Sequence, residues 1–253
     1  MNTFPIRRPY QGVLQILQFN RRSYMATSAG VAAALLAAPF LPPLWRTGLL
    51  LAVVPALFWL TSSLLVSHYV YDRFPLYDLN WLSRVLPRRP QRWINIHCGL
   101  DETSSILAAI FPDAVGHVVD IFEPHVMTET SIRQARCAKH DGARPLAARY
   151  DDLVFAANSF DTAFAIFSAH ELRRHDQRVG FFREIARVLV HHGELVLIEH
   201  SRDWRNLLAF GPGFLHFFSP LEWRGASASA GLELRAEFFL TPFVHVYLLR
   251  RTT

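Results

Sequence analysis

The chain has 253 residues, of which 51% are hydrophobic, 13% aromatic and only 19% charged, and its mean hydropathy is +0.15. Soluble domains usually carry about a quarter of charged residues. The composition therefore excludes a disordered chain and is not typical of a cytosolic protein. Two cysteines, Cys98 and Cys137, are too few for a disulfide framework, which is typical of a protein in a reducing compartment.

The formal charge of +5 is distributed unevenly along the chain. Residues 1–92 contain ten arginines against Asp72 and Asp78, a balance of +8, whereas residues 93–253 have a balance of −3. A nucleic-acid-binding domain concentrates positive charge on its binding face. The acidic balance of residues 93–253 therefore argues against a nucleic-acid partner, and the basic excess belongs to the apolar end of the chain.

Two long stretches near the N-terminus, residues 23–45 and 47–71, contain no Asp, Glu, Lys or Arg. Each exceeds the roughly 20 apolar residues that cross a bilayer core. Pro42 and Pro43 with Arg46 separate them, so we expect an all-α two-helix transmembrane hairpin over residues 23–71. Two alternatives stay open: two buried helices of a globular domain, or a hairpin that only dips into the membrane.

The segments that flank this hairpin predict how it is oriented. Residues 1–22 place apolar side chains on one helical face, which indicates an amphipathic helix in the membrane interface, and residues 72–92 form a juxtamembrane connector. Most of the arginines lie outside the two outer ends of the hairpin: Arg7, Arg8, Arg21, Arg22, Arg73, Arg84, Arg88, Arg89 and Arg92. The positive-inside rule then predicts a multi-pass protein of a bacterial-type inner membrane, with both termini and the following domain in the cytoplasm.

Residues 93–253 alternate between apolar runs of strand length and helical patterns. The expected strands cover residues 92–98, 115–121, 145–149, 160–167, 194–199, 232–240 and 244–250. The expected helices cover residues 104–111, 128–139, 176–189 and 220–231, with Thr128 as one N-cap and a capping box from Ser219 to Glu222. Strands that alternate with helices favour an α/β domain with a parallel sheet covered on both faces.

Three consecutive segments of this domain carry a family resemblance. They read Ser-Phe-Asp-Thr-Ala-Phe over residues 159–164, Phe-Arg-Glu-Ile-Ala-Arg-Val-Leu over 182–189, and Gly-Glu-Leu-Val-Leu-Ile-Glu-His over 193–200. From Trp93 onward the chain resembles class I S-adenosylmethionine (SAM)-dependent methyltransferases, of the kind called methyltransferase type 11. The resemblance implies a Rossmann-like seven-stranded sheet and SAM as the cofactor.

The resemblance also implies which residues bind the cofactor. The nucleotide loop of the family, Gly-x-Gly-x-Gly after an acidic residue, corresponds here to a degenerate loop in which only the central Gly99 is retained. Asp120 stands where a carboxylate binds the ribose hydroxyls, with Glu123 as a fallback, and an acidic residue before the fourth strand would approach the adenine. The cofactor-binding candidates are Asn95, His97, Gly99, Asp101, Asp120, Asp151 and Asp152.

Catalytic candidates follow the fourth and fifth strands, at the sheet edge where ligands of open α/β folds bind. His170 is the expected base for a hydroxyl acceptor, with Glu171 orienting it or binding the substrate, and His200 belongs to a second candidate pair with Glu199. The apolar run over residues 210–218 lines an acceptor pocket, lies against the bilayer or packs in the core. No histidine or cysteine spacing matches a structural zinc site, so no metal is expected.

Two functions are consistent with these features. In the first, the protein is a membrane-anchored SAM-dependent methyltransferase that acts on a lipophilic small molecule, such as a quinone, an isoprenoid or a lipid-like acceptor, at the cytoplasmic leaflet. In the second, the degenerate loop marks a methyltransferase fold without catalytic activity that serves as a structural or assembly subunit of a membrane-protein complex. A SAM-using enzyme of different chemistry is a third alternative.

Overall fold

A computed structural model describes residues 8–137 and 145–252. Its centre is a seven-stranded sheet with the order β3-β2-β1-β4-β5-β7-β6, in which only β7 runs antiparallel to its neighbours. The strands are β1 (Arg92–His97), β2 (Val115–Asp120), β3 (Leu146–Ala147), β4 (Phe160–Ile166), β5 (Leu189–His200), β6 (Leu232–Thr241) and β7 (Val244–Arg251). This sheet confirms the predicted α/β fold class.

The helices fall into an N-terminal group and a group that belongs to the sheet. The first group contains α1 (Gln11–Phe19), α2 (Arg21–Ala37), η1 (Ala38–Phe40), α3 (Pro43–His68), η2 (Tyr69–Arg73), η3 (Leu76–Asp78) and α4 (Leu82–Val85). The second contains α5 (Ser104–Ile110), α6 (Thr130–Arg136), η4 (Ala169–Glu171), α7 (His175–Val188), α8 (Trp204–Phe210), η5 (Gly211–His216) and α9 (Pro220–Ala228).

Most element positions agree with the sequence, and two predictions are wrong. The sixth helix begins at Thr130 after Glu129, not after Thr128, because Val126 and Met127 fold back to hydrogen-bond the carbonyl of Glu123. The fifth strand begins at Leu189 directly after α7, not at residue 194, and it contains an irregularity where His192 has φ 62°. The N-cap at Ser219 is confirmed, since its hydroxyl accepts the Glu222 N–H.

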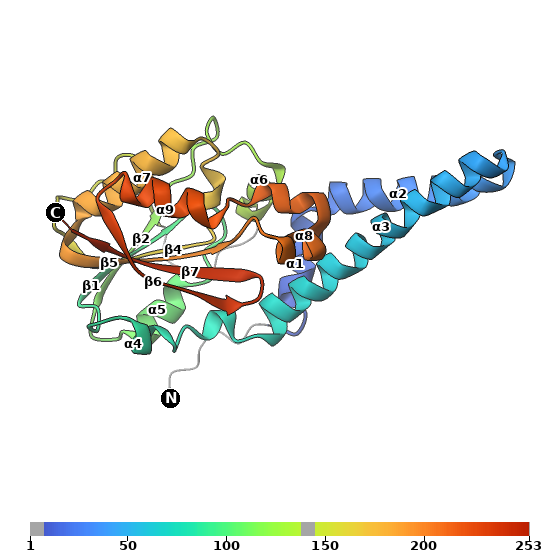
Figure 1. Ribbon diagram of the computed structural model, residues 1–253. Helices are drawn as coiled ribbons and strands as arrows, with labels where there is room; N and C mark the ends of the chain where they lie inside the picture. The colour runs from blue at the N-terminus through green and yellow to red at the C-terminus, as the bar shows by residue number, and fades with distance from the viewer. Residues whose placement is uncertain (1–7, 138–144, 253) are drawn as a thin grey trace.

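Two hydrophobic cores cover the two faces of the sheet. Helices α7 and α9 cover one face, where Phe181, Phe182 and Trp223 are buried (Figure 1). The other face is covered by α5 and by the segment expected as a connector at residues 72–92, whose Leu76, Leu79, Leu82 and Leu86 are buried against the sheet. The connector is therefore packed onto the sheet and adds a layer to it.

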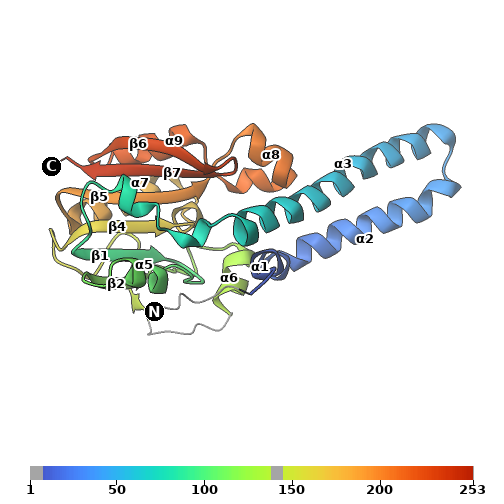
Figure 2. The same cartoon turned by 90° about the horizontal axis from the view of Figure 1, so that it is seen from below.

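Helices α2 and α3 form a hairpin that projects away from the sheet (Figures 1 and 2). Both are long and apolar enough to cross a membrane. Their side chains are mostly exposed, and the tip carries Phe40 at 87% and Trp45 at 70% exposure. Tyr24 and Ser63 form a hydrogen bond of 2.9 Å that joins the two helices.

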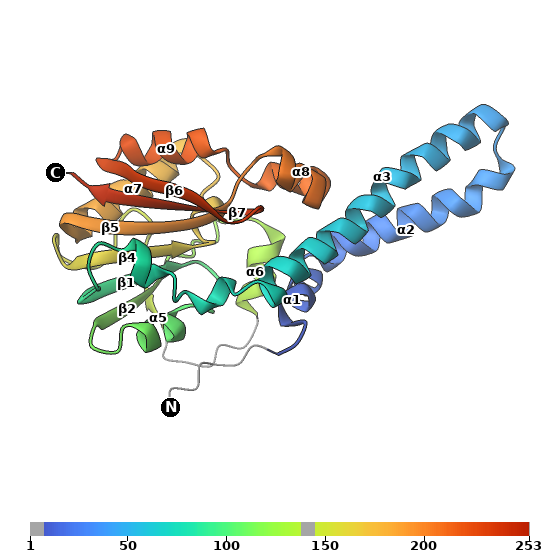
Figure 3. The same cartoon turned by 60° about the horizontal axis from the view of Figure 1, so that its bottom comes forward.

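The base of this hairpin lies against the α/β domain (Figure 3), and hydrogen bonds hold it there. The Asp72 carboxylate accepts the N–H groups of Gly12 at 2.6 Å and Val13 at 3.1 Å, so it caps the first turn of α1. The Ser62 hydroxyl on α3 donates to the carbonyl of Ala209 in α8 at 2.8 Å. Polar contacts thus fix both α1 and α8 to the root of the hairpin.

Candidate functional site

A cavity of about 890 Å³ lies between the hairpin root and the carboxyl ends of β1, β4 and β5. Its domain wall includes His97, Cys98, Gly99, Ser168, His170, Glu171, His200 and, from the apolar run, Phe210, His216 and Phe217. Its other wall comes from α1, α2 and α3, with Ile16, Phe19, Tyr24, Thr27, Pro55, Ala56 and Trp59. A volume of several hundred Å³ is typical of sites for small molecules and cofactors. The apolar run over residues 210–218 is therefore partly a cavity wall.

A chain of charged side chains crosses the domain side of the cavity. Nδ1 of His170 lies 2.6 Å from Oε2 of Glu199, and its Nε2 lies 3.5 Å from Oε1 of Glu171. Oε1 of the fully buried Glu199 also accepts the backbone N–H groups of Ala169 and His170, which fixes η4 in place. Burial lowers the pKa of His170, but the two carboxylates outweigh burial and raise it to about 10. An imidazole with this pKa holds both ring protons at neutral pH, which does not suit the predicted role of proton acceptor.

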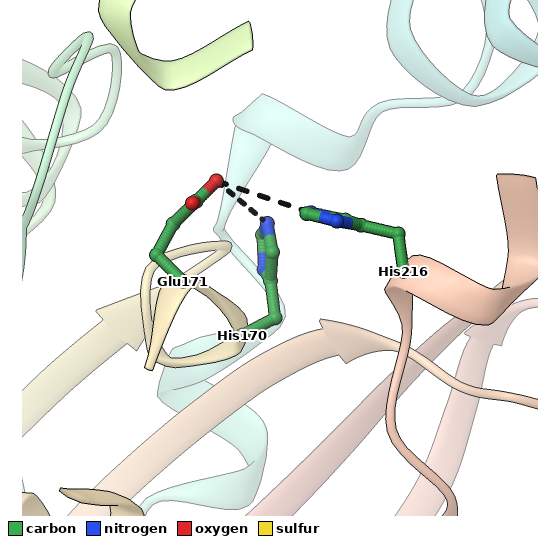
Figure 4. A group of neighbouring side chains, drawn as sticks. All are labelled: His170, Glu171 and His216. Carbon is green, nitrogen blue, oxygen red and sulfur yellow. Dashed lines mark ion pairs between the residues drawn. The ribbon is translucent and has the colours of Figure 1, made fainter. Parts of the chain in front are cut away.

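Glu171 and His216 complete this cluster (Figure 4). Burial raises the pKa of the Glu171 carboxyl, but the neighbouring His170 holds it below its usual value. Burial and the charge of His170 lower the pKa of His216 to about 3, so this imidazole is neutral. The guanidinium of Arg173 donates to the backbone carbonyls of both His170 and His216, at 3.1 Å and 2.6 Å, and so ties η4 to η5.

His200 lies on the cavity wall at the end of β5 and contacts the hairpin root. Its Nδ1 donates to the carbonyl of Phe243 at 2.8 Å, so the neutral ring accepts from the Tyr71 hydroxyl at Nε2, at 2.7 Å. Its ring also stacks between Phe167 and Phe217. Burial lowers its pKa to about 4. These contacts make His200 a link between the hairpin and the domain.

Among the cofactor candidates, His97 and Gly99 line the cavity. A Cβ atom on Gly99 would lie 2.5 Å from Cδ1 of Ile132, so α6 packs directly on the loop at this residue. The absence of a side chain at Gly99 therefore lets α6 approach closely.

Asn95 and Asp101 lie outside the cavity lining and organise the loop instead. The buried Asn95 amide donates to the hydroxyls of Thr103 and Ser104, at 2.9 Å and 2.7 Å. Oδ1 of Asp101 accepts the N–H groups of the same two residues, at 3.1 Å and 3.0 Å. The Asp101 carboxylate therefore binds the backbone at the start of α5, at a loop position where the methyltransferase family has a glycine.

The remaining acidic candidates also lie outside the lining. Asp120 follows β2 as expected, but its Oδ2 is bound by Arg136 at 2.6 Å and its Oδ1 accepts the Phe122 N–H. Asp151 forms an exposed ion pair with Arg149, and Asp152 is exposed beside it. The structure therefore brings together His97, Gly99, His170, Glu171 and His200, but not Asn95, Asp101, Asp120, Asp151 and Asp152.

The fit of SAM to this site differs between the two ends of the cofactor. Glu199, Glu171 and a protonated His170 sum to one negative charge, which suits a sulfonium cation beside the β1 and β4 ends. At the adenosine end, Asp120 would supply a carboxylate of the kind that binds ribose hydroxyls, and in this structure its Oδ2 is bound by Arg136. The charge of the cluster at His170 fits the sulfonium end of the cofactor.

Comparisons with known proteins identify the domain. Residues 95–197 match the family model described as methyltransferase domain. This part of the chain is therefore similar to a methyltransferase domain. Among curated proteins, no sequence matches the chain. The match confirms the resemblance and supports SAM as the cofactor that the sequence predicts.

Solved structures similar to this chain share the fold of the methyltransferase domain. Human N-acetylserotonin methyltransferase in complex with SAM aligns with a TM-score of 0.57 at 11% identity, over 94% of this chain and 70% of that chain. A SAM-dependent methyltransferase from Aquifex aeolicus aligns with a TM-score of 0.52 at 14% identity, over 73% and 92%. One from Methanosarcina mazei aligns with a TM-score of 0.51 at 16% identity, over 68% and 96%.

Three residues that form part of the site, Tyr71, Glu199 and His216, were not predicted from the sequence as its main residues. Tyr71 lies far in the sequence from the methyltransferase motifs, and His216 was marked only as part of the apolar run over residues 210–218. Glu199 carried a signal, because a carboxylate that ends a continuous apolar strand must find a partner.

Proposed function

We propose that the protein is a membrane-anchored SAM-dependent methyltransferase that acts on a lipophilic small molecule at the cytoplasmic leaflet of a bacterial-type inner membrane. The observation that carries this proposal is the shared cavity: helices α1, α2 and α3 supply one wall, and the β1, β4 and β5 ends supply the other. A lipophilic acceptor enters between the hairpin helices, and its reactive group meets the polar end of the cavity.

Exposed apolar side chains support a membrane location for the hairpin and for the adjacent helix α8. Monomeric soluble proteins rarely expose large contiguous apolar patches. Besides the apolar surface of α2 and α3, α8 exposes Trp204 at 65% and Leu208 at 51%, on the same side of the domain as the hairpin (Figure 1). These residues extend the apolar surface to the part of the domain nearest the membrane.

The chain's own residues have two tasks in this proposal. SAM, when bound, supplies the methyl group, and Gly99, His97 and Ser168 hold its methionine end at the carboxyl edge of the sheet. Methyl transfer requires the acceptor atom to lie in line with the breaking bond, so the protein contributes mainly proximity and alignment. His170, Glu171 and His216 hold the polar group of the acceptor, while Trp59, Ala56 and Phe210 hold its apolar part and exclude water.

Transfer of labelled methyl groups tests the activity and the substrate class. The full chain in lipid nanodiscs is incubated with methyl-labelled SAM and a total bacterial lipid extract, and label is expected in the organic phase. Ala56→Trp narrows the hairpin wall and should abolish this transfer while SAM affinity stays unchanged. Leu57→Trp, on an exposed neighbouring position, is the control. Equal transfer by both variants contradicts the proposed entry route.

Cysteine labelling tests the topology. A Trp45→Cys variant places a thiol at the exposed hairpin tip, and the native exposed Cys137 reports on the domain. In intact cells, a membrane-impermeant maleimide should label position 45 but not Cys137, and lysis should expose Cys137. Labelling of Cys137 in intact cells contradicts the orientation, and no labelling at position 45 contradicts a full crossing.

A second candidate function, an assembly subunit without activity, is favoured by one observation: the Asp120 carboxylate is already paired with Arg136. Calorimetric titration with SAM separates the two. For an enzyme, Asp120→Ala should weaken SAM binding by about 1–3 kcal/mol, the value of a hydrogen bond to a charged group. Exposed Asp113→Asn is the control. Absence of SAM binding at high micromolar concentration favours the assembly subunit.

A further inference from the structure

The cluster at the polar end of the cavity has the composition of a metal centre. His170, Glu171 and His216 offer two imidazole nitrogens and one carboxylate oxygen, all within 4.8 Å of one another (Figure 4). Two histidines and one carboxylate are the ligand set of several catalytic zinc and iron sites. We propose that His170, Glu171 and His216 bind one divalent transition-metal ion, with a coordination position open to the cavity.

The spacing of the ligand atoms suits such an ion. Oε1 of Glu171 lies 3.5 Å from Nε2 of His170 and 3.9 Å from Nε2 of His216. Ligand atoms bound tetrahedrally at about 2.0–2.2 Å from zinc are roughly 3.3–3.6 Å apart. Because the widest separation within the cluster reaches 4.8 Å, the two imidazoles would approach each other by about an ångström to complete the site.

Glu171 supplies an independent indication that something is bound here. Its side chain is only 5% exposed, and its Oε2 is buried without a hydrogen-bond partner among residues 8–137 and 145–252. A buried carboxylate oxygen without a partner is costly, because the loss of water is not compensated. A cation held between Glu171 and the two imidazoles provides the compensation.

The surrounding residues orient the ligands as they do in known metal sites. Metal-binding histidines usually donate their second N–H to a carboxylate or a carbonyl. Nδ1 of His170 has this arrangement with the buried Glu199, which leaves Nε2 directed toward Glu171. Arg173 fixes the backbones of both histidines at the same time. A dication and the carboxylates of Glu171 and Glu199 also sum to zero charge.

Three protein ligands leave a position for an oxygen of a small molecule. Because all three ligands line the cavity, this position is accessible to whatever occupies it. Resting on the proposed function, the oxygen would be the hydroxyl or carbonyl of the methyl acceptor, which the ion would bind and orient.

Metal titration of the full chain in detergent tests the site. After treatment with a chelator, the protein is titrated with Co²⁺ and Zn²⁺, and we expect one equivalent to bind with visible Co²⁺ absorption bands that Zn²⁺ abolishes. His216→Ala and Glu171→Gln should weaken binding at least about 100-fold, and Glu199→Gln about 10- to 100-fold. The double variant His191→Ala/His192→Ala, at two exposed histidines, should bind as the wild type does.

Two readouts keep the outcome clear. Circular dichroism and the thermal midpoint establish whether each variant is folded. If His216→Ala is not folded, His216→Asn takes its place. Unchanged binding in folded His216→Ala, or no stoichiometric binding by the wild type, overturns the site. SAM titration of the same metal-free samples reports on the proposed function separately, since SAM binding can fail while metal binding succeeds.

Discussion

His200 makes the stability of the protein depend on pH in a calculable way. The neutral ring donates to Phe243 and accepts from Tyr71, and burial lowers its pKa from 6.5 to about 4. The unfolded chain therefore binds a proton at this residue at a higher pH than the folded protein does. The contribution of His200 to the free energy of unfolding is complete above about pH 6.5 and is lost as the pH falls toward 4.

The magnitude follows from the shift in pKa. A shift of 2.5 pKa units at 1.36 kcal/mol per unit corresponds to about 3 kcal/mol in total, of which about 2 kcal/mol is lost between pH 7 and pH 5. Denaturant unfolding of the detergent-solubilised protein at these two pH values measures the loss. The variant His200→Asn removes the titrating group, and exposed His125→Asn is the control.

The difference between wild type and variant isolates His200 from all other titrating groups. The wild type should lose about 2 kcal/mol more than His200→Asn between pH 7 and pH 5, and His125→Asn should behave as the wild type does. An equal loss in all three proteins would refute the inference that the buried ring is held neutral.

Two further substitutions test how the hairpin root is fixed to the domain. Asp72→Ala removes the acceptor of the Gly12 and Val13 N–H groups and should cost about 2–4 kcal/mol, visible as faster hydrogen exchange over α1, whereas exposed Asp113→Ala should leave exchange unchanged. Gly211 has φ +54°, and a Cβ there would lie 2.6 Å from the Trp59 ring, so Gly211→Ala should destabilise the α3–α8 contact by about 1–3 kcal/mol. Gly213→Ala, with its nearest contact at 3.7 Å, is the control, and an equal thermal midpoint for both variants would contradict this packing argument.

The sequence predicted the sheet well because its strands are buried. Residues 163–166 and 195–198 are continuous apolar runs, and such runs signal strands covered on both faces. The N-cap at Thr128 was wrong because residues 123–127 form their own turn, which local propensity did not reveal. The irregular start of β5 depends on pairing with β4, which is a tertiary effect.

The candidate site was less predictable, because it depends on contacts between distant segments. His170 and Glu171 were found from their place after β4, but His216 comes from η5, which Arg173 ties back to η4. The pairing of Asp120 with Arg136 depends on the position of α6, and that helix packs closely because residue 99 is glycine. Family position alone did not distinguish a carboxylate beside the cavity from one that is already paired.

The same contacts connect the two parts of the chain in a way that neither part predicts alone. Tyr71 in η2, directly after α3, binds His200 at the end of β5, and Ser62 binds α8, so the hairpin root forms a wall of the cavity in addition to carrying apolar surface. A membrane anchor that served only to attach the domain would not need to close its ligand cavity. The shared wall therefore favours a substrate that is taken from the lipid phase, because the route to the polar cluster at His170 then begins between the hairpin helices.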